Sequence, residues 1–203
     1  MSPHLLGALL VVGGYLCGSI PWGVVMSRLV LGVDVRTVGS GNIGATNVAR
    51  AGGKKLGVLV MLLDAAKAVV PILVARALLA GSPEGEWWTL AVAVAAFVGH
   101  LFPAWLRFRG GKGVATAFGI FVVLAPWAAL AGLVAWLAGY LATRISSVGS
   151  LSGTVACVAG AFVTHGLRHP ASWTALLIGA LIVLRHRGNI GRLWRGEERR
   201  LRV

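Results

Sequence analysis

Long apolar runs separated by short polar segments make up most of the chain. The runs occupy roughly residues 5–31, 56–80, 88–106, 114–142, 151–166 and 172–185. A helix needs about 20 residues to cross the hydrocarbon core of a bilayer. The pattern therefore predicts an all-α integral membrane protein in which residues 1–203 form a single membrane-embedded domain.

The run 114–142 decides the number of crossings, because it holds Pro126 near its middle. As one helix it gives six crossings. As two short helices that turn near Ala125 and Pro126 it gives seven transmembrane helices, with the N-terminus outside and the C-terminus cytoplasmic. Two arms of about 14 residues would each reach roughly 21 Å, so they would have to tilt, thin the membrane or stop partway.

The distribution of basic residues favours seven crossings. Cytoplasmic loops of membrane proteins are enriched in lysine and arginine. With seven crossings, every basic residue except Lys67, Arg76 and Arg168 lies on or near the cytoplasmic face, and 186–203 becomes a basic cytoplasmic tail. The formal net charge is +13, yet only 12% of the residues are charged. This composition indicates contact with anionic lipid and anionic substrates rather than with nucleic acid.

Three glycine-rich, basic segments lie between the apolar runs, at 39–50, 109–113 and 185–190. Glycine lets the backbone approach a ligand closely, and backbone N–H groups with Ser, Asn, Arg and Lys side chains suit phosphate. The simpler alternatives are interfacial turns and basic side chains that reach lipid headgroups. Seven crossings place all three segments, together with 146–150, on the cytoplasmic face, where we expect one phosphate-binding site.

The candidate binding residues are donors and glycines of these segments. They are Ser40, Gly41, Asn42, Gly44, Thr46, Asn47, Arg50, Gly110, Gly111, Lys112, Gly113, Thr116, Ser150, His186, Asn189 and Glu197. Lys112 directly precedes an apolar helix and is expected at its positive end. His186 and Asn189 are three residues apart and share a face if the helix continues.

The remaining polar residues support neither a metal site nor a covalent mechanism. Asp64 and Lys67 lie inside the second apolar run, where we expect an ion pair that orients the helix; a proton or ion pathway is the alternative. His100 is expected to be a hydrogen-bonded structural histidine, and His165 and His169, on the outer face, have no expected role. A nucleophile needs a base and an orienting acid, and the chain has only 6 Asp and Glu residues.

Several of these segments resemble the signatures of a known family, the bacterial acyl-phosphate:glycerol-3-phosphate acyltransferases (PlsY family). The run GSGNIGATNVAR at 39–50 resembles the first signature. The other similar segments are 99–103 with 108–116, Ser150 and Leu151 with 186–190, and Asp64 with Lys67, where Ala68 replaces an expected glycine.

The resemblance implies a seven-helix, multi-pass enzyme of the bacterial inner membrane with its active site on the cytoplasmic face. It would transfer a fatty acyl group from long-chain acyl phosphate to the 1-hydroxyl of glycerol 3-phosphate, giving lysophosphatidic acid and phosphate. This is the first acylation of phospholipid synthesis, and the enzyme that makes acyl phosphate would be a working partner. No metal or other cofactor is implied. By motif, Ser40, Lys112, His186 and Asn189 would be the catalytic residues, with Ser150 among the phosphate ligands.

Two other classes of protein use similar features. A transporter of an anionic metabolite would also line a polar face, but transporters usually show internal repeats and broken helices near the membrane midplane, and the chain has no evident repeat. A lipid-binding scaffold held by its basic tail would leave the glycine-rich segments dispensable.

Overall fold

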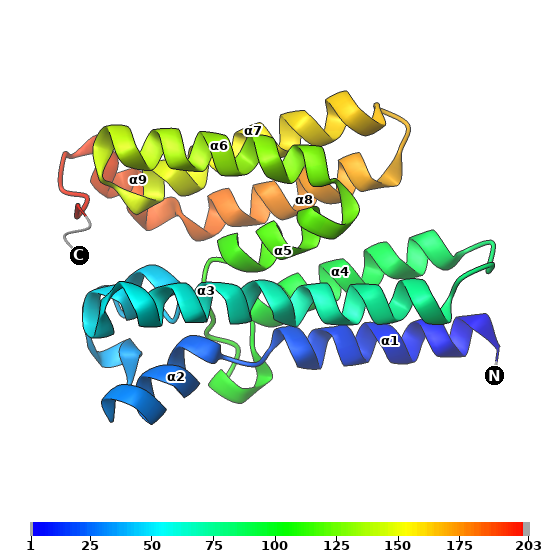
Figure 1. Ribbon diagram of the computed structural model, residues 1–203, viewed down its shortest axis with the longest axis horizontal. Helices are drawn as coiled ribbons and strands as arrows, with labels where there is room; N and C mark the ends of the chain where they lie inside the picture. Colours follow the sequence, from blue (N-terminus) through cyan, green and yellow to red (C-terminus); the bar gives the residue numbers. More distant parts are fainter. Residues whose placement is uncertain (1, 201–203) are drawn as a thin grey trace. The chain divides into compact units, whose positions relative to one another are not determined.

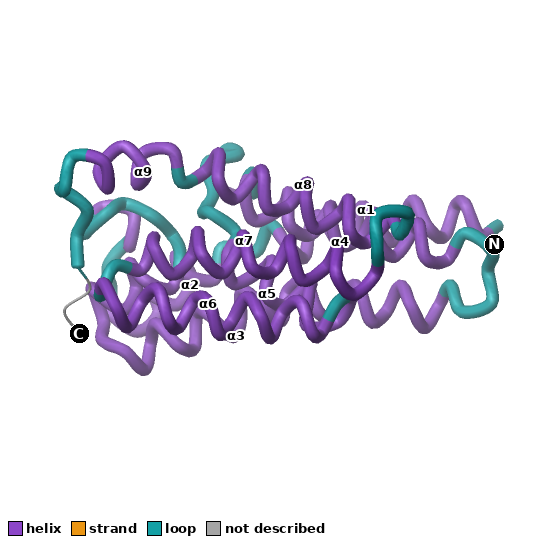
Figure 2. The backbone as a smooth tube through the Cα atoms, turned by 90° about the horizontal axis from the view of Figure 1, so that it is seen from above, coloured by secondary structure: helices purple, strands orange, loops and turns teal. Residues whose placement is uncertain are grey.

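The computed structural model describes residues 2–200, and every regular element in that part of the chain is a helix (Figures 1 and 2). The α-helices are α1 (Pro3–Gly18), α2 (Trp22–Leu31), α3 (Ala45–Leu78), α4 (Gly85–Leu101), α5 (Val114–Leu124), α6 (Pro126–Thr143), α7 (Ser146–His165), α8 (Pro170–Arg185) and α9 (Arg187–Trp194). Two short 3-10 turns are η1 (Val35–Thr37) and η2 (Ala104–Leu106). The predicted all-α class is confirmed.

The helices are divided between two compact units, Met1–Val123 and Leu124–Val203, and each is described by itself. In the first unit α1, α3 and α4 pack against one another and α2 packs on α3. In the second unit α7 packs between α6 and α8, and α9 follows α8. Small residues let the helices approach closely: a side-chain carbon at Gly153 of α7 would lie 2.8 Å from the carbonyl oxygen of Gly132 in α6.

Prolines divide two of the predicted apolar runs. The run 114–142 separates into α5 and α6, with Pro126 as the first residue of α6, as expected. The arms are unequal, with 11 and 18 residues, or about 17 Å and 27 Å of helix. The first run, 5–31, was expected to be continuous but is interrupted before Trp22. Pro21 there has no N–H to continue the helix and restricts the residue before it.

Helix α3 begins inside the first glycine-rich segment. It starts at Ala45, well before the apolar run at 56–80, and is kinked at Gly53, whose φ is 84°. The first glycine-rich segment is therefore a loop only over 39–44. Thr46, Asn47 and Arg50 lie on the first turns of the helix.

The surfaces of the helices are those of a membrane protein. Among the described residues, five helical stretches are long and apolar enough to cross a membrane, and α5 and α8 are shorter apolar helices. Leu9, Leu62 and Val163 are exposed, whereas the charged Asp64 and Lys67 are buried. The number of crossings and the sides of the two termini stay predictions.

Candidate active site

Asn47 holds the first glycine-rich loop in place. Its side chain is 1% exposed. Its Oδ1 accepts a hydrogen bond from the backbone N–H of Ser40 at 2.8 Å, and its Nδ2 donates to the carbonyl oxygens of Val35 at 2.9 Å and Val38 at 3.0 Å. Because both amide hydrogens are bonded within the protein, Asn47 in this arrangement positions Ser40 rather than donating to a ligand.

The same loop leads into the N-terminus of α3. The Oδ1 of Asn42 accepts from the N–H of Gly44 at 3.0 Å, and the N–H of Gly41 donates to the carbonyl of Val38 at 3.0 Å. Gly44 is the residue before the helix and provides no side-chain cap. A helix N-terminus without a side-chain cap offers backbone N–H groups to an anion, and the exposed hydroxyl-bearing Ser40 lies on the loop that precedes it.

The second glycine-rich segment is folded against the end of α4. The N–H of Gly110 donates to the carbonyl of Leu101 at 3.1 Å, and the N–H of Gly111 donates to the carbonyl of His100 at 3.2 Å. The segment ends at Gly113, directly before α5, so Lys112 lies beside the N-terminus of that helix as predicted from sequence. Thr116 is different: it is fully buried in α5, and its hydroxyl has no hydrogen-bond partner among the described residues.

The two loops of the first unit share one apolar cluster. Leu106, in the turn that precedes the second glycine-rich segment, packs against the cluster that contains Ile43 of the first loop. Val35 and Val48, which flank that loop, belong to the same cluster. The first unit therefore brings two donor-rich loops together, each leading into a helix N-terminus.

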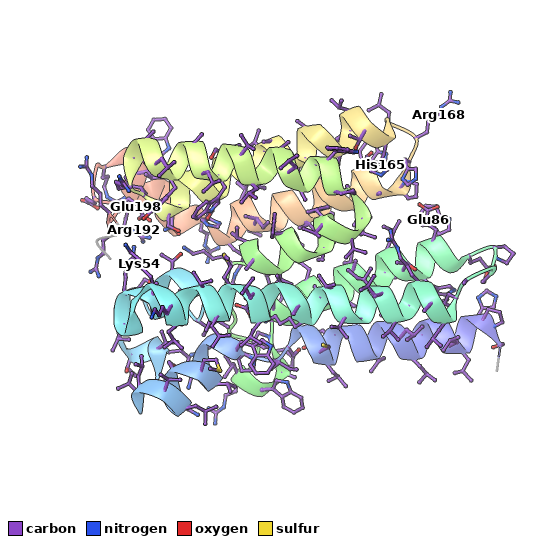
Figure 3. All side chains as sticks on the ribbon, viewed as in Figure 1. Lys54, Glu86, His165, Arg168, Arg192 and Glu198 are labelled. Atoms are coloured by element: carbon purple, nitrogen blue, oxygen red, sulfur yellow. The ribbon has the colours of Figure 1, made fainter. Side chains whose placement is uncertain are left out.

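In the second unit, Glu198 is the centre of a polar cluster. Its Oε1 accepts hydrogen bonds from Ser147 at 2.8 Å and from the Asn189 amide, and its Oε2 lies 2.6 Å from the Nε of Arg192. Figure 3 shows the Arg192 and Glu198 side chains together at one end of this unit. Burial raises the pKa of Glu198, but the hydrogen bonds from Asn189, Arg192 and Ser147 outweigh it and hold the pKa below its usual range.

His186 lies at the junction of α8 and α9 and is 2% exposed. Its Nδ1 is 2.8 Å from the carbonyl oxygen of Ile182. A carbonyl only accepts hydrogen bonds, so this contact assigns the ring proton to Nδ1 and fixes the orientation of the ring. Ser150 is also buried, and its hydroxyl donates to the carbonyl of Ser146 at 2.9 Å.

Glu197 was the candidate expected from sequence, and the structure places its neighbour Glu198 in the cluster. The carboxylate of Glu197 is exposed and accepts from the Nε of Arg195 at 2.7 Å. Residues 197–200 have no regular structure, so no helical periodicity distinguishes the two adjacent glutamates. The sequence singles out Ser147, which also bonds Glu198, only as part of the segment 146–150.

Labelled polar side chains mark the two ends of each unit. In Figure 3, Lys54 lies near the start of α3 and Glu86 at the opposite end of the first unit; in the second unit, Arg192 and Glu198 lie at the end opposite to His165 and Arg168. His165 and His169 have ring centroids 4.9 Å apart at that far end. Within residues 2–200, no group of three or more His, Cys, Asp or Glu side chains is arranged to hold a metal ion.

These helices and their donor-rich ends define a multi-pass integral membrane protein, and comparisons with known proteins identify its family. The family model described as glycerol-3-phosphate acyltransferase matches residues 8–196. A glycerol-3-phosphate acyltransferase of Anaeromyxobacter sp. (strain K) is 74% identical and covers 99% of this chain and 100% of the relative. That of Myxococcus xanthus (strain DK1622) is 50% identical, covering 94% of this chain and 97% of the relative.

Solved structures agree with this result. PlsY (YgiH), an integral membrane glycerol 3-phosphate acyltransferase, is 42% identical in its glycerol 3-phosphate form, with a TM-score of 0.88, and the match covers 96% of this chain and 94% of that one. Its lysophosphatidic acid form is 41% identical, with a TM-score of 0.86 and the same coverage. The chain belongs to the glycerol-3-phosphate acyltransferase family.

Proposed function

We propose that this protein transfers a fatty acyl group from acyl phosphate to the 1-hydroxyl of glycerol 3-phosphate, releasing lysophosphatidic acid and phosphate. The observation that carries the proposal is the pair of glycine-rich loops in the first unit. Each leads into a helix N-terminus, and together they present Ser40 and Lys112. Both substrates carry phosphate, and loops of this kind suit phosphate.

The reaction needs no covalent acyl-enzyme, because the acyl group of an acyl phosphate is already activated. The glycerol hydroxyl attacks the carbonyl carbon, a new ester C–O bond forms, and the C–O bond to phosphate breaks. The proton of the hydroxyl passes to an oxygen of the departing phosphate. Catalysis then rests on positioning and on electrostatic stabilisation of that phosphate.

The proposed roles follow from the motifs in which these residues lie. Lys112 and His186 neutralise the departing phosphate, and Ser40 donates to a phosphate oxygen. Asn189, whose amide donates to the carboxylate of Glu198, also takes part in phosphate binding. In this proposal the active site faces the cytoplasm at a bacterial inner membrane, and an enzyme that makes acyl phosphate supplies the donor.

The test uses purified protein with radiolabelled glycerol 3-phosphate and either palmitoyl phosphate or palmitoyl-CoA. We expect a lipid-soluble labelled product when the donor is palmitoyl phosphate and none when the donor is palmitoyl-CoA. Lys112→Ala should lower the turnover rate by about 100-fold, because it removes a cation from the developing phosphate charge. His165→Ala, at the far end of the second unit, is the control and should leave the rate unchanged. Product formation with palmitoyl-CoA alone would overturn the donor assignment.

A further inference from the structure

Three ionisable side chains form a buried cluster inside the first unit. Asp64 and Lys67 of α3 and His100 of α4 are 2%, 3% and 3% exposed. The Lys67 Nζ lies 2.7 Å from the Asp64 Oδ1, and the His100 Nδ1 lies 3.7 Å from the same oxygen. Charged groups inside a membrane bundle are costly and are retained where they serve function. The proposed chemistry does not use these three residues.

Lys67 connects the cluster to the first glycine-rich loop. Its ammonium donates to the carbonyl oxygen of Ile20 at 2.9 Å, at the interruption between α1 and α2. Lys67 thereby adds a second hydrogen bond to a carbonyl that also accepts from the N–H of Trp22 at 3.1 Å, at the point where Pro21 interrupts the helix. The next helix, α2, carries Gly23, and a side-chain carbon at Gly23 would overlap the carbonyl oxygen of Ile43. The start of α2 therefore rests directly on the loop that presents Ser40.

His100 connects the cluster to the second loop. Its backbone carbonyl accepts the hydrogen bond from Gly111 at 3.2 Å. Its ring nitrogen Nε2 lies so close to Gly111 that a side-chain carbon there would overlap it. The opposite ring nitrogen, Nδ1, faces the Asp64 carboxylate. The ring is thus held between Asp64 and the glycine that precedes Lys112.

We propose that Asp64, Lys67 and His100 are positioning residues that set the separation of the two phosphate-binding loops of the first unit. The buried Asp64 carboxylate lies beside both Lys67 and His100. Lys67, through α2, supports the loop at 39–44, and the His100 ring supports the segment at 110–113. The inference rests on the proposed function, since it assigns phosphate binding to those two loops. It adds the interior residues that fix their geometry.

The test compares Asp64→Asn, His100→Gln and the double variant Asp64→Asn with Lys67→Met. For each variant we would measure the thermal unfolding temperature, the turnover rate per folded enzyme and the KM for glycerol 3-phosphate. A fourth measurement is the glycerol 3-phosphate concentration that gives half of the maximal rise in unfolding temperature. Thr89→Val is the matched control, because Thr89 is buried at the other end of α4 and donates to the Gly85 carbonyl at 2.7 Å.

Misplaced loops raise the KM and lower the turnover rate, whereas a merely less stable protein binds substrate as before. We expect Asp64→Asn and His100→Gln to lower kcat/KM by about 10- to 100-fold. Both should also raise the glycerol 3-phosphate concentration that gives half of the maximal thermal shift. The double variant should regain unfolding temperature relative to Asp64→Asn, since no unpaired charge stays buried, but should keep the kinetic defect. Thr89→Val should lower only the unfolding temperature.

The inference is overturned if the variants change unfolding temperature while KM and turnover stay within twofold of the wild type. It is equally overturned if all three variants fail to fold while Thr89→Val folds, because the cluster is then purely structural. A wild-type protein that shows neither product nor a thermal shift with glycerol 3-phosphate would instead contradict the proposed function itself.

Discussion

At the scale of single residues, the structure separates side chains that hold the site from side chains that present donors. Asn47 and Ser40 belong to the same motif, and from sequence both are candidate phosphate-binding residues, with Ser40 also expected to be catalytic. The structure buries the amide of Asn47 and bonds it to three backbone groups, whereas it exposes Ser40. Burial depends on how the chain folds around a motif, and that information is not in the motif.

Replacing Asn47 by alanine should therefore act through the loop. Three backbone groups each lose a hydrogen bond, so we expect a loss of about 1–3 kcal/mol in the free energy of unfolding and a rise in the KM for glycerol 3-phosphate. Thermal unfolding and steady-state kinetics provide the two measurements. Ser172→Ala is a suitable control, because it also removes a buried hydroxyl bond, 2.8 Å to the carbonyl of Gly166, but at the far end of the second unit. An unchanged KM in Asn47→Ala would contradict the positioning role.

The pair Glu197 and Glu198 permits a matched test of pH dependence. The donors around Glu198 hold its pKa below the ordinary value, so its carboxylate stabilises the folded protein above the unfolded-state pKa of about 4.3. That contribution is lost as the pH falls through the lowered pKa of the folded state. We expect Glu198→Gln to reduce the unfolding temperature at pH 7 and to flatten its decline in acid, whereas Glu197→Gln should follow the wild type. Parallel curves for all three proteins would refute the assignment.

At the scale of elements, sequence located the apolar helices well and their ends less well. The break at Pro126 was predictable because proline acts locally on the backbone. The early start of α3 was not predictable, because Thr46, Asn47 and Arg50 were expected to be hydrogen-bond donors in a loop. What forms the first turns of α3 is a tertiary arrangement: Val48 is buried in the same cluster as Ile43 and Leu56.

Helix packing yields a paired prediction on α1. Gly18 faces the backbone of Ala96 in α4 so closely that a side-chain carbon would overlap it, whereas Gly13 on the same helix has nothing within 4 Å. Gly18→Ala should cost about 1–3 kcal/mol in stability through overpacking. Gly13→Ala should be neutral or stabilise by up to about 1 kcal/mol, because alanine favours the helix. Thermal unfolding in detergent measures both, and equal effects would show that α1 does not pack on α4 in this way.

At the scale of the whole molecule, sequence was sufficient for the all-α class and, through the resemblance, for the family. Hydropathy identifies helices that face lipid, and the long signature at 39–50 is specific for the family. The contacts that connect the motifs could not be predicted from sequence, because they join residues far apart in the chain. Lys67 and Ile20, for example, are 47 positions apart. Likewise, the separation of the chain into two compact units has no visible signal in composition.

Membrane topology supplies the prediction at this scale. In a background with Cys17 and Cys157 replaced by alanine, Lys54→Cys should react with an impermeant maleimide only from the cytoplasmic side, and Arg168→Cys only from outside. The physical reason is the cytoplasmic bias of basic loops. Labelling of intact cells and of inverted vesicles distinguishes the two faces. Reaction of Lys54→Cys in intact cells would contradict the seven-crossing topology.

The brevity of α5 has a consequence for where the reaction partners meet. Its 11 residues give about 17 Å of helix, against roughly 30 Å of hydrocarbon in a typical bilayer. In the seven-crossing topology the bilayer beside α5 would thin, which brings the headgroups closer to the bilayer centre there. At such a thinned site, glycerol 3-phosphate from the water and an acyl phosphate held in the bilayer by its acyl chain would meet at the level of the headgroups.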